Sequence, residues 1–202
     1  MKKLTLLSIA ILALINSSCK MHVFYVKSNM NKDADTAYVF ENDTVRIRYD
    51  LWENKGKMHF SIYNKLNVPL FIDWKNSSFI MNDLPVPYWI DKTETRSRGG
   101  GVSNRGVSSY NSAGTMVRED RVTMIPPHSK ILKDYIGRLC KSDYPTKDDN
   151  RKHFRNYIAY SVNEDTQGEN FSDCDFEVTE IKVIKNNKMI SYKSPSRFYT
   201  DK

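Results

Sequence analysis

Alternation of apolar and polar side chains constrains the fold of this chain more than any other feature. Every second residue is apolar over 45–51, and the same period of two returns over 58–63, after a tight turn at Glu53-Asn54-Lys55-Gly56. This period places successive side chains on opposite faces of a half-buried strand. The two segments therefore predict a β-hairpin.

Further strands are predicted at 70–75, 79–81, 122–125, 154–162, 176–184 and 189–192, the last closing a hairpin across Asn186-Asn187. The alternation breaks near Glu180, which predicts a β-bulge there. Apolar residues 131, 132, 135 and 136 fit either a short helix or a bulged strand. About eight short strands and at most one short helix predict an all-β fold, an antiparallel β-sandwich with immunoglobulin-like packing.

Residues 97–114 contain almost nothing that a core could bury. Glycine and serine dominate this segment, which predicts a long flexible loop. The remaining pattern fits one domain over residues 36–202, because a chain of this length is barely long enough for two cores.

The N-terminal segment has the order of an export signal. Lys2 and Lys3 precede an uncharged run from Leu4 to Ile15, and this run is much shorter than the 20 or so residues that span a bilayer. Residues 1–18 are therefore predicted to be a signal peptide that is removed. One of two alternatives is an ordinary secretory signal peptide. Cleavage near Ser18 would then leave Cys19 as a free or disulfide-bonded thiol.

The segment Ile15-Asn16-Ser17-Ser18-Cys19 resembles the lipobox of bacterial lipoproteins, in which a diacylglycerol is attached to the cysteine. The resemblance implies lipidation of Cys19, a membrane partner held through the acyl chains, and a place in the cell envelope. Lys20 favours the outer membrane, since inner-membrane retention typically needs Asp at that position, and the side that the domain faces stays open. Residues 19–35 are then expected to be a lipid-anchored tether. The strand-rich remainder is similar to small β-sandwich lipoproteins of Gram-negative bacteria.

Two cysteines remain if Cys19 is lipidated. Cys140 and Cys174 form either a disulfide or two separate thiols, and a bond closing a loop of about 35 residues would contribute roughly 4 kcal/mol. Neither cysteine has a CxxC or Cys-His spacing, so zinc and thioredoxin-like chemistry are not expected.

Residues with catalytic or ligating chemistry are scattered. The four histidines lie far apart, there is no Gly-x-Ser-x-Gly motif, and the net charge of +7 is dispersed. No metal, cofactor or nucleic-acid partner is predicted. Three aromatic side chains, Trp52, Tyr63 and Phe71, fall on outward parities and form a candidate ligand-binding platform, unless a second sheet or a loop buries them.

These features predict a lipid-anchored, non-enzymatic envelope protein with a binding or assembly role toward a protein or glycan partner. One alternative is a carbohydrate-active or peptide-processing enzyme with its site under residues 97–114. A second alternative is a glycan-binding module built on Trp52 and its neighbours.

Overall fold

The structure is a computed structural model that describes residues 20–81, 83–89, 97–103, 106–112, 120–138, 153–164 and 170–201. The predicted signal peptide, Cys19 and Cys140 lie outside these residues, so their predicted roles are not decided by the fold.

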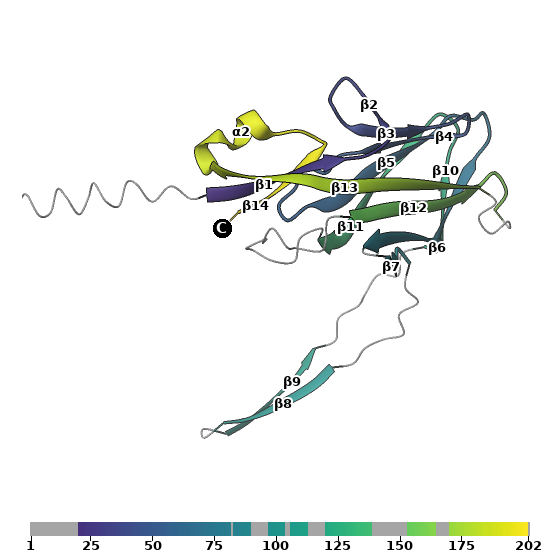
Figure 1. The fold of residues 1–202 in the computed structure, drawn as a ribbon. Coiled ribbons are helices and arrows are strands. Elements are labelled where there is room, and N and C mark those ends of the chain that lie inside the picture. Colours follow the sequence, from purple (N-terminus) through teal and green to yellow (C-terminus); the bar gives the residue numbers. More distant parts are fainter. Residues whose placement is uncertain are drawn as a thin grey trace, which may run out of the picture.

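Two antiparallel sheets enclose the core (Figure 1). The seven-stranded sheet contains, in spatial order, β10 (Val122–Ile125), β6 (Leu70–Met81), β12 (His153–Ser161), β13 (Asn170–Lys185), β1 (Lys20–Lys27) and β14 (Arg197–Asp201), with β7 (Leu84–Pro87) beside β6. The five-stranded sheet contains β11 (Lys130–Arg138), β5 (Lys57–Asn64), β4 (Val45–Tyr49), β3 (Tyr38–Glu41) and β2 (Asn31–Lys32). The predicted all-β antiparallel sandwich is confirmed, whereas immunoglobulin-like packing stays a prediction.

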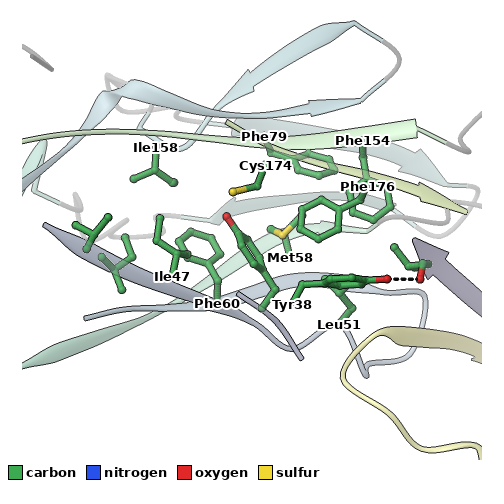
Figure 2. Close-up of a cluster of buried hydrophobic side chains, with 14 of the residues drawn as sticks. Tyr38, Ile47, Leu51, Met58, Phe60, Phe79, Phe154, Ile158, Cys174 and Phe176 are labelled. Carbon is green, nitrogen blue, oxygen red and sulfur yellow. Dashed lines mark hydrogen bonds between the residues drawn. The ribbon is translucent and has the colours of Figure 1, made fainter. Parts of the chain in front are cut away.

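Aromatic side chains join the two sheets in the core (Figure 2). Phe176 on β13 stacks on Phe154 of the adjacent β12, with ring centroids 5.0 Å apart. From the opposite sheet, the ring of Tyr49 meets Phe176 edge-on at 5.0 Å and that of Tyr38 does so at 6.0 Å. Offset and edge-on contacts are the favourable geometries for aromatic pairs, so Phe176 is a central contact between the sheets.

The bulge predicted near Glu180 is confirmed, and the alternative left open for residues 131–136 is decided. The pairing of β1 with β13 shifts register where Tyr25 opposes Glu180 and Val26 opposes Val178, which leaves Thr179 as the extra residue of a bulge. The 131–136 segment belongs to β11, whose pairing with β5 is irregular after Asp134. Of its two predicted forms, the bulged strand is therefore the observed one.

The Gly/Ser-rich segment is not simply a loop, so the prediction for 97–114 is wrong in part. Ser97–Ser103 forms β8 and Gly106–Ser112 forms β9, and the two strands pair in a separate two-stranded sheet, drawn away from the sandwich in Figure 1. Backbone N–H and C=O groups alone make such a ladder. A strand made largely of glycine and serine has no alternation of apolar residues by which it could be recognised in the sequence.

The predicted tether over 19–35 is wrong, because residues 20–27 and 31–32 both form strands of the two sheets. Residues 20–27 form β1, an inner strand paired with β13 on one side and β14 on the other. Phe24 and Val26 enter the main core, whereas Met21 and Val23 enter a second, smaller cluster on the outer face of the sheet. A strand buried on both faces shows a near-continuous apolar run, and Val23-Phe24-Tyr25-Val26 fits that pattern.

The predicted closing hairpin over 186–192 is also wrong. Asn186–Lys188 forms a 3-10 turn, η1, that leads directly into the helix α2, Met189–Tyr192. Met189 and Tyr192 are one turn apart and both pack on the second cluster, so the segment covers the outer face of the sheet rather than extending it. No helix among the described residues has the length and apolar character needed to cross a membrane.

Candidate binding surface on the seven-stranded sheet

The outer faces of the two sheets differ in chemistry. Ion pairs cover much of the five-stranded sheet, among them Arg48 Nε with Asp33 Oδ2 at 2.6 Å and Lys65 Nζ with Glu41 Oε1 at 2.9 Å. The outer face of the seven-stranded sheet exposes several large apolar side chains, among them Met124 and Phe171. A cluster of exposed apolar side chains indicates an interaction site, whereas a single exposed apolar side chain is common on any protein surface.

Tyr157 on β12 and Phe171 on β13 form an aromatic pair on this exposed surface. Their rings stack with centroids 5.3 Å apart and planes 23° from parallel, and Phe171 is 58% exposed. Tyr157 opposes Asp173 and Phe171 opposes Ala159, so the two rings meet as diagonal neighbours on adjacent strands. Diagonal neighbours lie within reach when the side chains are aromatic.

Phe71 and Met124 extend the same face across two further strands. Met124 on β10, 52% exposed, is directly opposite Phe71 on β6, and Phe71 is opposite Ser161 on β12. Only β12 separates Phe71 from the strand of Phe171, so the two lie roughly 10 Å apart across the strands. We call Phe71, Met124, Tyr157 and Phe171 the outer apolar patch.

Paired charges adjoin the patch on the same strands. Arg155 Nε donates to Asp173 Oδ1 at 3.0 Å, and a second nitrogen of the guanidinium contacts the other oxygen of this carboxylate. His153 Nε2 lies 2.5 Å from Asp175 Oδ1. An apolar centre with paired charges at its edge is the usual composition of a protein interface.

The sequence contained a signal for this patch that the strand assignments missed. Strand β13 begins at Asn170, six residues before the predicted start at Phe176. Phe171 has the parity of Asp173 and Asp175, whereas Cys174 has the parity of buried Phe176. An aromatic residue in phase with the charged side of a strand is the pattern that would have identified it.

The three aromatic residues predicted to form a platform do not come together. Trp52 follows β4 and packs against Tyr199 of β14, with centroids 5.0 Å apart. Tyr63 lies on the outer face of the five-stranded sheet, opposite Arg46 and Lys130. Only Phe71 belongs to the outer apolar patch, so the predicted grouping is wrong although one of its members lies on the exposed surface.

Cys174 is part of a buried polar group inside the sandwich. Tyr88 donates its hydroxyl proton to Asn156 Oδ1 at 2.5 Å, and Asn156 Nδ2 donates to the Tyr49 oxygen at 3.0 Å. The Tyr49 hydroxyl also approaches the Cys174 side chain. Cys174 is a free thiol in the structure, and its side chain faces the core (Figure 2). The disulfide with Cys140 stays a prediction, and it would require residue 140 to enter the core.

Burial of the thiol leads to a prediction about alkaline stability. Desolvation raises the pKa of Cys174 from 9.0 to about 12, so the unfolded thiol ionises at a pH where the folded one does not. The free energy of unfolding is therefore unaffected by Cys174 ionisation at neutral pH, and it falls as the pH rises above about 9. Between about pH 9 and pH 10 we expect the native protein to lose about 1 kcal/mol more of its unfolding free energy than Cys174→Ala does. Urea unfolding at both pH values measures this difference, and equal losses would contradict a free, desolvated thiol.

Three of the four histidines contact a carboxylate or amide oxygen of another side chain. His59 contacts Asp134, His128 Nε2 lies 2.7 Å from Asn67 Oδ1, and His153 contacts Asp175. Of the residues that the structure describes, no three His, Cys, Asp or Glu side chains form a group that could hold a metal ion. Comparison of the chain with protein-family models, with curated proteins and with solved structures gives no match.

Proposed function

We propose that the chain is a non-enzymatic, lipid-anchored protein of the cell envelope that binds another envelope protein through the outer apolar patch. The observation on which this rests most is the Tyr157–Phe171 stack, in which Phe171 stays 58% exposed on the outer face of the seven-stranded sheet. Aromatic residues at the centre of an interface supply a large share of binding energy. The lipid anchor would present this surface to partners within the cell envelope.

The neighbouring side chains support a protein partner over a glycan. A sugar requires aromatic faces for stacking and unpaired polar groups for its hydroxyls. Tyr157 and Phe171 each cover one face of the other ring, and the nearby Arg155 and Asp173 are paired with each other. A mixed apolar and ion-paired surface instead suits a protein partner with exposed apolar side chains.

The anchor part of the proposal rests on the sequence before β1. Two lysines, a short apolar run and small residues before Cys19 are the features of a lipoprotein signal. The outer membrane is the proposed destination, because Lys20 follows the cysteine in place of Asp.

Site-specific photo-cross-linking in intact cells tests the binding surface. Phe171 is replaced by p-benzoylphenylalanine, and the matched control places the same residue at Leu132, which is 66% exposed on the outer face of the five-stranded sheet. We expect one discrete protein adduct from position 171 and none from position 132. A second substitution, Tyr157→Ala, should weaken the adduct about tenfold, the effect of a modest interface hot spot.

Two results would contradict the proposed partner. Adducts of equal yield and size from positions 171 and 132 would show that the patch has no particular role. A glycan array on which the native protein binds a sugar and Phe171→Ala does not would assign the patch to carbohydrate instead.

A further inference from the structure

The end of the sandwich where β1 begins has a composition suited to a membrane surface. Figure 1 draws α2 at this end, close to the start of β1. Lys20, the first residue of β1, is the direct partner of Lys185, the last residue of β13. Lys185 continues into η1 and α2. We call Lys20, Lys185, Lys188, Ile190 and Lys193 the basal tip.

One apolar side chain projects from the basal tip. Met189 and Tyr192 fix α2 by packing on the second cluster. Ile190 lies between them on the opposite side of this single turn and is 88% exposed. Because its two neighbours hold the helix in place, Ile190 points outward as a result of the fold.

The charged side chains of the basal tip are lysines, and Asp201 of β14, opposite Met21, is an acidic residue at the same end of the sheet. Between Glu180 and Asp201 the sequence contains no acidic residue, whereas it contains Lys182, Lys185, Lys188, Lys193 and Arg197. Lys182 and Arg197 lie over the Tyr25 ring, and Lys185, Lys188 and Lys193, all within five residues of Ile190, are exposed. Exposed lysines near an apolar side chain favour an anionic bilayer surface.

The position of Cys19 decides how close the basal tip lies to the bilayer. A flexible tether over residues 20–35 would let the domain move roughly 50 Å from its anchor. Since β1 starts at Lys20, the Cα of Cys19 is only about 4 Å from that of the first residue of the sheet. An acyl chain on Cys19 would therefore hold this end of the sandwich directly against the headgroups.

We propose that the basal tip lies on the anionic surface of the membrane, with Ile190 inserted among the headgroups and the lysines paired with lipid phosphates. This inference rests on the proposed lipid anchor at Cys19. The basal tip is then the end of the sandwich that contacts the membrane, and β13 extends away from the membrane surface. Its far end, where Asn170 begins the strand, lies roughly 50 Å from Lys185.

Tryptophan quenching by brominated lipids tests the orientation. Ile190→Trp is compared with Val68→Trp, because Val68 is 50% exposed and precedes β6 at the far end, where Ile72 pairs with Tyr160 and Tyr160 with Asn170. Both variants are made in the full chain and reconstituted in phosphatidylcholine vesicles containing about one third phosphatidylglycerol. The three native tryptophans give the same background in both.

We expect brominated lipids to quench the added tryptophan at position 190 and not the one at position 68. Lys185→Gln combined with Lys188→Gln should lower the affinity of the tip for these vesicles by about fivefold per lysine and reduce the quenching. Equal quenching at positions 190 and 68 in a lipidated protein would overturn the inference and leave the anchor intact. A mass spectrum with unmodified Cys19 would contradict both the proposed lipid anchor and the inference that rests on it.

Discussion

Replacing Phe176 by alanine is expected to destabilise the domain by about 4 kcal/mol, the usual cost of removing a buried phenylalanine ring. Phe176 has no exposed surface and contacts Phe154 in its own sheet and Tyr49 and Tyr38 in the other. Loss of the ring therefore removes contacts between the sheets as well as within one. This cost is a large fraction of the roughly 5–15 kcal/mol that stabilises a typical domain.

Phe171→Ala is the matched control for that substitution. It removes the same ring from the same strand, but Phe171 faces solvent, so the expected loss of stability is within about 1 kcal/mol. Urea unfolding of the two variants at neutral pH measures both values. Losses of similar size would contradict the assignment of one phenylalanine to the core and the other to the outer apolar patch. The control variant also remains folded enough for the binding experiments.

Cys19→Ala is expected to abolish lipid attachment to the chain. Two or three acyl chains each contribute about 0.8 kcal/mol per buried methylene, which is enough for stable anchoring, and alanine has no sulfur to accept them. Metabolic labelling with palmitate should mark the native protein and leave Cys19→Ala unmarked. Ser18→Ala is the control, because it keeps a small residue before the cysteine and should be labelled normally. Palmitate labelling of Cys19→Ala at the level of Ser18→Ala would show that the lipid is attached at a residue other than Cys19.

Much of the fold could be predicted because alternation is a local property of the sequence. The hairpin of β4 and β5 and the bulge near Glu180 follow from which side of each strand is apolar. Strand β1 was missed because an inner strand covered on both faces has no alternation to detect. Its burial depends on α2 and the second cluster, which come from residues far away in the sequence.

The candidate surface was harder to predict than the core. Whether Trp52, Tyr63 and Phe71 share a face depends on which sheet each strand joins, and periodicity within one strand does not contain that information. Tyr63 and Phe71 belong to different sheets, so their outward side chains lie on opposite faces of the sandwich. Phe171 was missed for a different reason, since the start of its strand was placed too late.

The mass of the N-terminal peptide of the mature protein, purified from membranes, tests the proposed function most directly. We predict a chain that begins at Cys19 and is heavier than its sequence by an attached diacylglycerol. Such a chain would place the anchor one residue before the sandwich. A mature chain with an unmodified Cys19 would contradict the proposed lipid anchor and the membrane contact of the basal tip.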